Sequence, residues 1–135
     1  MKKLYFLSLT ILMSIFSFGQ ATDLIISEYA EGTVGNSKYV EIFNGTGADV
    51  DLAGYRIWRI TNGGTWPESF IALTGTLANN GTLVLANNAT DVPGADVYDS
   101  TITWNGDDAV GLAKDIATVW TLIDVVGTEG TDPGT

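Results

Sequence analysis

Apolar and polar residues alternate in short runs along most of this chain, and turn-forming residues separate the runs. Seven runs are rich in β-branched and aromatic residues and predict strands at residues 24–30, 38–44, 55–60, 70–73, 82–86, 109–113 and 120–126. No segment after residue 21 keeps a helical period over eleven residues. Short strands at this spacing predict an all-β domain, either a sandwich or a barrel.

Asparagine–glycine pairs mark several turns between these runs. Asparagine tolerates a positive φ angle and glycine adopts it without steric cost, so such pairs are typical of tight turns. Asn80 and Gly81 stand directly before the 82–86 strand and predict a hairpin with the 70–73 strand. The longer connection 87–99 is the predicted crossover between two sheets.

The N-terminal segment has a different pattern from the rest. Lys2 and Lys3 precede an apolar run at residues 4–18, and small residues follow it. This order predicts a secretory signal peptide, residues 1–21, with a helical apolar segment. The alternative is a retained membrane anchor, for which the run is short and interrupted by serine and threonine. Cleavage would leave residues 22–135 as one domain without a membrane span, secreted or on the cell surface.

The composition limits the chemistry that the chain supports. The 135 residues include 16 acidic and 6 basic side chains, with a formal net charge of −10. Nucleic-acid affinity depends on basic residues that neutralise phosphates, so no direct nucleic-acid binding is expected. The sequence contains no cysteine and no histidine. It therefore excludes thiol catalysis, a Ser-His-Asp triad and histidine- or thiolate-bound zinc within these residues.

Two glutamates, Glu28 and Glu41, lie in runs that are otherwise apolar or aromatic. Because an unpaired buried charge is costly, each carboxylate must be solvated or satisfied. One interpretation is a carboxylate pair that binds a cation or the backbone amides of a partner. The other interpretation is structural: hydrogen bonds from a neighbouring loop, or ion pairs with Arg56 or Arg59, hold these carboxylates in the fold.

Aspartate and asparagine residues gather in the predicted loops. Calcium takes oxygen ligands, and the calcium candidates are Asp91, Asp107 and Asp108. Their surroundings do not follow the spacing of a known calcium loop, and aspartate and asparagine are also ordinary turn formers. We therefore expect no cofactor, with calcium as the alternative.

Four tryptophans are further candidates. Trp58 and Trp120 lie within predicted strands, where aromatic side chains usually belong to the core. Trp66 and Trp104 lie in or beside loops, from which their rings could stack on a sugar ligand. A carbohydrate-binding β-sandwich is therefore an alternative function, and no catalytic residue is predicted.

Five blocks of this sequence resemble the lamin tail domain of secreted bacterial proteins. In order, over residues 23–134, they are LIISEY at 24–29, YVEIFN at 39–44, VDLAGY at 50–55, NGDDAVGL at 105–112 and LIDVVG at 122–127. The resemblance implies an immunoglobulin-like β-sandwich without catalytic activity of its own. It also implies structural roles for the signature positions, which are Glu28, Glu41, Asn44, Asp51, Leu52, Gly54 and Asp124.

The same resemblance implies a setting for the domain. Bacterial domains of this kind lie beside secreted nucleases, phosphatases and other hydrolases, and in exported surface proteins. We expect a noncatalytic module that binds a protein or a surface polymer within a larger secreted or cell-surface protein. The alternative is an accessory domain of a secreted nuclease or other hydrolase with its catalytic domain downstream. The family pattern continues past residues 132–135, so we expect its C-terminal strand to be missing here.

Overall fold

The computed structural model describes residues 20–132, so the predicted signal peptide and its helix lie almost wholly outside the described residues. No helix in the described part is long and apolar enough to cross a membrane. The strands are β1 (Ile25–Glu31), β2 (Lys38–Phe43), β3 (Val50–Asp51), β4 (Tyr55–Ile60), β5 (Ser69–Ala72), β6 (Thr76–Leu77), β7 (Thr82–Ala86), β8 (Val97–Tyr98), β9 (Ala109–Ile116) and β10 (Val119–Val126).

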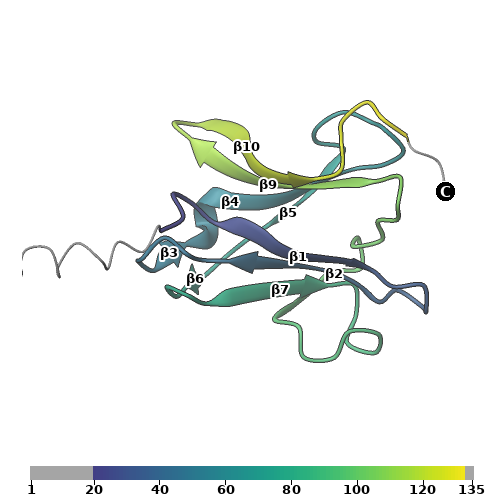
Figure 1. The fold of residues 1–135 in the computed structure, drawn as a ribbon, viewed down its shortest axis with the longest axis horizontal. Coiled ribbons are helices and arrows are strands. Elements are labelled where there is room, and N and C mark those ends of the chain that lie inside the picture. Colours follow the sequence, from purple (N-terminus) through teal and green to yellow (C-terminus); the bar gives the residue numbers. More distant parts are fainter. Residues whose placement is uncertain (1–19, 133–135) are drawn as a thin grey trace, which may run out of the picture.

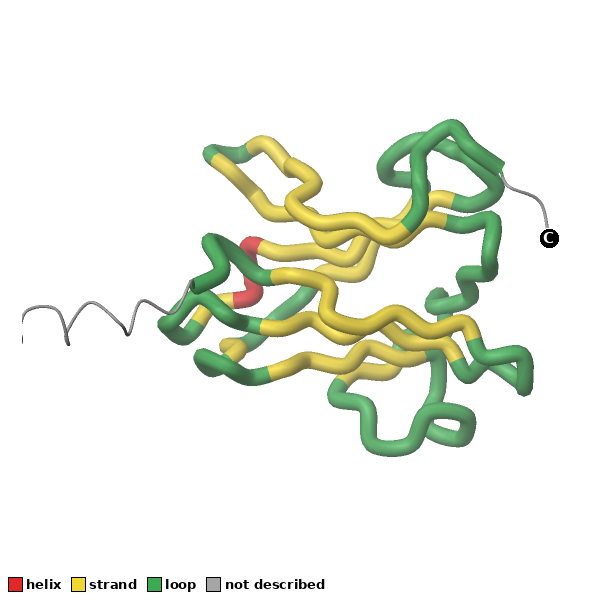
Figure 2. The backbone as a smooth tube through the Cα atoms, viewed as in Figure 1, coloured by secondary structure: helices red, strands yellow, loops and turns green. Residues whose placement is uncertain are grey.

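Two four-stranded sheets pack face to face (Figure 1). One has the order β1-β2-β7-β8, and the other has the order β10-β9-β4-β5. The pairs are antiparallel except for β7 and β8, which run parallel. A small ribbon of β3 and β6 lies at one end, where the 3-10 turn η1 (Leu52–Gly54) joins β3 to β4 (Figure 2). The predicted all-β, immunoglobulin-like sandwich is confirmed.

Strand alternation explains how the core forms. In β2, Val40 and Ile42 are fully buried, whereas Tyr39 and Glu41 are half-buried and project from the opposite face. Inward-facing side chains of both sheets form the core together with side chains from the turns, the connecting segments and β6. The core residues are Leu24, Val40, Ile42, Leu52, Tyr55, Ile57, Leu73, Leu77, Leu85, Ile102, Trp104, Val110 and Leu112.

Strand β9 departs from this alternation, because its first five residues are all buried. Val110 and Leu112 belong to the core, whereas Ala109, Gly111 and Ala113 face away from it. A strand buried on both faces needs a second layer of side chains on its outer side. The outer face of this sheet is therefore covered rather than simply solvated.

The two sheets are joined along one edge, between β1 and β10. The register of β1 shifts between Ile26 and Glu28, and that of β10 shifts between Leu122 and Asp124. There the Ile26 N–H donates a hydrogen bond of 2.7 Å to Asp124 Oδ2. A β-bulge leaves a backbone group without its ladder partner, and Asp124 supplies one across the sandwich edge.

Asp23 anchors the start of the described chain to the second sheet. Its carboxylate accepts hydrogen bonds of 2.6 Å each from Lys114 Nζ and Tyr55 OH. Burial raises the pKa of Asp23, but the hydrogen bonds from Lys114 and Tyr55 outweigh burial, so the pKa lies below its ordinary value. This ion pair fixes the chain directly after the predicted signal peptide.

Two predicted connections were wrong. Strand β7 pairs with β2, and β5 pairs with β4, so no hairpin joins β5 to β7. The turn at Asn80 and Gly81 bonds to Asn44 instead, through Asn80 N–H to Asn44 O (2.8 Å) and Asn44 N–H to Gly81 O (3.0 Å). The segment 87–99 returns to the same sheet through β8, and the chain crosses to the other sheet within 99–108. A local turn signal locates a bend but does not identify the strand that pairs beyond it.

Candidate functional site

The outer face of the β10-β9-β4-β5 sheet carries aromatic side chains around one arginine. Arg56 and Trp58 share this face of β4, and Trp58 lies opposite Phe70 of β5. Trp120 and Leu122 reach the same face from β10. We call this surface the outer aromatic face, and its residues are Arg56, Trp58, Trp66, Phe70, Trp120 and Leu122.

Arg56 is held between two aromatic rings. Its guanidinium carbon lies 3.7 Å from the centroid of the Trp120 ring and 4.2 Å from that of the Phe70 ring. Contacts of this kind contribute about 0.5–1 kcal/mol each at exposed sites. Within the described part of the chain, no guanidinium N–H group of Arg56 donates a hydrogen bond. Stacking therefore fixes the guanidinium plane and leaves its in-plane donors available for a carboxylate or another oxyanion.

A glycine on β9 makes room for this layer. A Cβ atom at Gly111 would lie 2.4 Å from Leu122 Cδ2 and 3.5 Å from Trp66 Cη2. Both side chains thus pack directly on the strand backbone. Trp58, the cross-strand partner of Gly111, is 8% exposed, whereas Phe70 is 52% exposed. The outer aromatic face is therefore closely packed near β9 and open to solvent at Phe70.

One of the two tryptophans predicted to stack on a ligand lies on this face. Trp66 is half-buried beside Gly111. Trp104, however, is 1% exposed: its ring stacks on Tyr29 at a centroid distance of 5.7 Å, and its Nε1–H donates to Ala30 O at 3.2 Å. The prediction for Trp104 was wrong, because a loop position in the sequence does not prevent a side chain from entering the core.

Trp66 was the one residue of the outer aromatic face predicted as a ligand contact; the other five were missed: Arg56, Trp58, Phe70, Trp120 and Leu122. Trp120 was expected in the core but is half-buried on the outer side. A signal was present in the spacing of Arg56 and Trp58, because residues two apart on a strand share a face. The spacing does not say which face is outward, since both faces of this strand carry large apolar side chains.

Glu28 and Glu41 are direct cross-strand partners on β1 and β2. Glu41 accepts a hydrogen bond of 2.7 Å from Ser27 Oγ, and Glu28 accepts one of 2.9 Å from Tyr39 OH. Glu28 is exposed and Glu41 is half-buried. The two carboxylates therefore come together on the outer side of the first sheet, where local hydroxyl groups hold them.

The arginines proposed as partners of these glutamates lie on the other sheet. Arg56 belongs to the outer aromatic face, and Arg59 donates hydrogen bonds of 2.7 Å to Thr101 O and to Thr103 Oγ1. Neither arginine pairs with a glutamate of β1 or β2, so the predicted ion pairs were wrong. A sequence pattern does not show which charges face each other across a sandwich.

Asn44 is fully buried at the end of β2 and makes four side-chain hydrogen bonds. Its Nδ2 group donates to Ala48 O (2.8 Å) and Leu77 O (2.9 Å). Its Oδ1 atom accepts from Thr46 N (3.1 Å) and Thr46 Oγ1 (2.8 Å). Every donor of the amide group is used, which fixes the loop after β2 and ties it to β6.

Three further signature residues shape the turn η1. Asp51 caps it, because its Oδ1 atom accepts a hydrogen bond of 3.0 Å from Ala53 N. Leu52 is 2% exposed and packs into the core. Gly54 ends the turn, and a Cβ atom at this position would meet no atom within 4 Å. Asp51 and Leu52 therefore have structural positions, whereas neither backbone conformation nor close packing requires glycine at position 54.

The three calcium candidates do not form one cluster. Asp91 accepts hydrogen bonds of 2.9 Å from Asn36 N and from Asn88 Nδ2, and so it fixes two loops together. Asp107 and Asp108 are neighbours on the turn before β9. Within residues 20–132, no group of three or more acidic side chains is placed to hold a metal ion.

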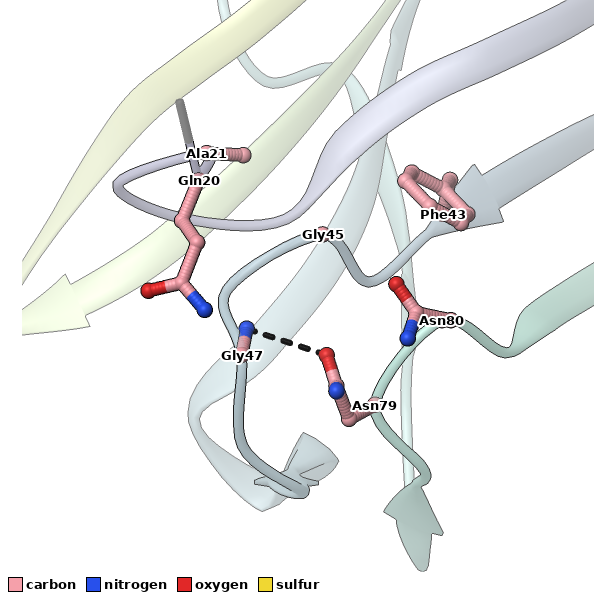
Figure 3. Close-up of a pocket in the computed structure, with 7 residues that line it drawn as sticks. All are labelled: Gln20, Ala21, Phe43, Gly45, Gly47, Asn79 and Asn80. Atoms are coloured by element: carbon pink, nitrogen blue, oxygen red, sulfur yellow. Dashed lines mark hydrogen bonds between the residues drawn. The ribbon is translucent and has the colours of Figure 1, made fainter. Parts of the chain in front are cut away.

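A surface cavity of about 470 Å³ lies near the start of the described chain (Figure 3). The Gly47 N–H donates a hydrogen bond of 3.0 Å to Asn79 Oδ1 at its rim. None of the lining residues has an ionisable side chain, so this cavity offers no general acid, base or nucleophile. The lining residues are Gln20, Ala21, Phe43, Gly45, Gly47, Asn79 and Asn80.

Comparison with protein families finds a match to the Lamin Tail Domain over residues 19–130. Comparison with curated proteins finds no match. The matched segment covers most of the chain, and it includes every described strand and the whole outer aromatic face. The chain therefore belongs to the lamin tail domain family.

Proposed function

We propose that this domain is a noncatalytic module that binds a partner protein through the outer aromatic face. Lamin tail domains are immunoglobulin-like and typically have binding or structural roles. The observation that carries the proposal is the stacked Arg56 guanidinium, whose N–H groups have no acceptor in the described part of the chain. A partner with a carboxylate beside apolar side chains complements this arrangement.

The composition of this face supports a protein partner. Binding energy at protein interfaces concentrates in a few tryptophan, tyrosine and arginine residues, each contributing about 2 kcal/mol or more when truncated. Here one arginine and several aromatic rings are already ordered by mutual packing, which lowers the entropy lost on binding. Phe70 and Val125, at 52% and 47% exposure, add accessible apolar surface.

We further propose that the module belongs to a larger secreted or cell-surface protein. The predicted signal peptide at residues 1–21 supports export. Absence of histidine and cysteine leaves this chain without the usual nucleophile–base pairs. If a hydrolase domain follows in the same polypeptide, this module would serve as its accessory domain and bind through the same face.

A cell-surface binding assay tests the proposal. The fluorescently labelled protein is added to cells of its source organism, and a photo-crosslinking amino acid at Phe70 identifies what it contacts. Because two interface anchors are removed, Arg56→Ala with Phe70→Ala should weaken binding by about tenfold or more. The control is Val34→Ala, since Val34 is 79% exposed and lies in the loop between β1 and β2, which belong to the other sheet.

The outcomes separate the functions. Loss of binding only in the double variant, with a crosslinked protein partner, supports the proposal. Equal binding by the double variant and the wild type would refute the assignment of this face. Binding to isolated polysaccharide, lost in the same variant, would instead show a carbohydrate-binding module.

A further inference from the structure

A small cavity lies where the turn before β9 meets the segment after β10. The close approach of these segments depends on Gly127, which has a φ angle of +94°. A Cβ atom there would lie 2.7 Å from Ala109 Cβ and 3.0 Å from Asp108 O, so the Gly127 backbone packs directly on these residues and forms one wall of the cavity. The volume is about 180 Å³, and the lining residues are Gly106, Asp107, Asp108, Gly127, Thr128 and Thr131.

Asp107 is an unpartnered carboxylate in this cavity. The residue is 9% exposed, and its Oδ1 atom is buried without a hydrogen-bond donor among the described residues. A carboxylate that is nine-tenths buried is strongly disfavoured unless hydrogen bonds or a positive charge offset the loss of water. No basic side chain lines the cavity. A bound cation would supply the missing positive charge.

Asp108 adds a second negative charge at the same place. Its Oδ1 and Oδ2 atoms accept hydrogen bonds of 3.2 Å from Asn62 N and from Asn105 N, respectively, so backbone N–H groups hold this carboxylate beside Asp107. Arg59 forms no ion pair with either aspartate, since its guanidinium donates to Thr101 and Thr103. The turn therefore holds two adjacent carboxylates without a basic partner among the described residues, and Asp107 Oδ1 also lacks a hydrogen-bond donor.

We propose that this cavity is a calcium site in which Asp107 and Asp108 provide the charged ligands. Calcium accepts about six to eight oxygen ligands in flexible geometry, including backbone carbonyls. Thr128, Thr131 and the peptide carbonyls of the cavity are neutral oxygen donors of this kind. Magnesium demands a near-ideal octahedron and zinc favours nitrogen or sulfur ligands, so both suit the cavity less well. The site extends beyond the proposed partner-binding function and does not depend on it.

Calorimetric titration of the EDTA-treated protein with calcium chloride tests this site. We expect one saturable site, and a melting temperature that rises with calcium and falls back with EDTA, because a ligand of the folded state stabilises it. Asp107→Asn keeps the side-chain size and should weaken calcium affinity by about tenfold or more, because affinity depends on ligand charge. The matched control is Asp115→Asn: Asp115 is exposed at the opposite end of β9, and solvent screening should limit its effect to about twofold.

Amide chemical shifts locate the site without any substitution, so the test holds even if Asp107→Asn does not fold. Calcium should shift the resonances of residues 105–108 and 127–131. Absence of saturable binding, shifts confined to other segments, or equal losses in the two aspartate variants would overturn the proposal. Tighter binding of magnesium than of calcium would overturn the choice of metal.

Discussion

Replacing Asn44 by alanine tests how much of this fold depends on one buried amide. The side chain is fully buried and connects three backbone segments through four hydrogen bonds. Asn44→Ala leaves the Leu77 carbonyl without its donor in a buried place, and it removes the restraints on the loop carrying Thr46 and Ala48. The β3–β6 ribbon should lose its connection to β2.

The magnitude follows from the burial of each bond. The unsatisfied Leu77 carbonyl costs about 1–3 kcal/mol, while the bonds to Thr46 and Ala48 contribute about 0.5 kcal/mol each where water can replace them. The sum is about 3 kcal/mol, a large part of the roughly 5–15 kcal/mol that stabilises a typical domain. With a typical slope in guanidinium chloride, the unfolding midpoint should fall by about 1 M.

Tryptophan fluorescence during guanidinium unfolding measures this effect. Asn79→Ala is the matched control, because Asn79 is exposed and its side chain accepts a single hydrogen bond, from Gly47 N. Asn44→Asp should be as damaging at pH 7, since a carboxylate cannot donate to two carbonyls, and its stability should recover as pH falls, because burial raises the pKa of an acid. Equal losses for Asn44→Ala and Asn79→Ala would refute the reasoning.

Three further predictions concern strain and charge. Gly127→Ala should cost about 2 kcal/mol more than Gly130→Ala in denaturant unfolding: both glycines have positive φ, but only Gly127 has backbone atoms against a new Cβ. The pKa of Asp23 in the folded protein lies below 3.8, so the ionised carboxylate stabilises the fold above that pH, and this stabilisation is lost as the pH falls through the folded pKa. Asp23→Asn should therefore lower the free energy of unfolding by about 1 kcal/mol at neutral pH and weaken the dependence of the melting temperature on acidic pH. Glu41→Gln should leave the melting temperature unchanged or raise it, as it removes a like charge opposite Glu28, and a clear fall would contradict this.

The seven long strands could be predicted because each has a local pattern. Strands β3, β6 and β8 contain two residues each, too few for any period to show. Pairing was harder to predict than strand position, because it depends on side chains far apart in sequence. The Asn80–Gly81 turn illustrates the difference: its backbone bonds to the Asn44 backbone, beside the Phe43–Thr82 pair. The partner therefore follows from the pairing of β7 with β2 and not from the turn itself.

The outer aromatic face shows the same limit. Arg56, Phe70 and Trp120 are separated by up to 64 positions in sequence but meet across three strands of one sheet, including β4 and β10, which do not pair directly. Composition identified aromatic residues as candidates, yet Trp104 is buried in the core whereas Trp120 is half-buried on the outer aromatic face. Whether a side chain points into the core or away from it decides which environment it has, and on a strand that direction depends on the pairing register.

The segment after β10 connects the two candidate sites. As sequence it is a turn-forming tail without an apolar partner, yet Glu129 Oε1 accepts a hydrogen bond of 3.0 Å from Trp66 N, and Gly130 N–H donates one of 3.3 Å to Gly64 O. The same segment forms one wall of the proposed calcium cavity. A cation held there would restrain the loop that places Trp66 on the outer aromatic face. Such coupling is reciprocal, so calcium should bind more tightly when a partner occupies that face. An unchanged calcium affinity in the presence of the partner would show that the two sites are independent.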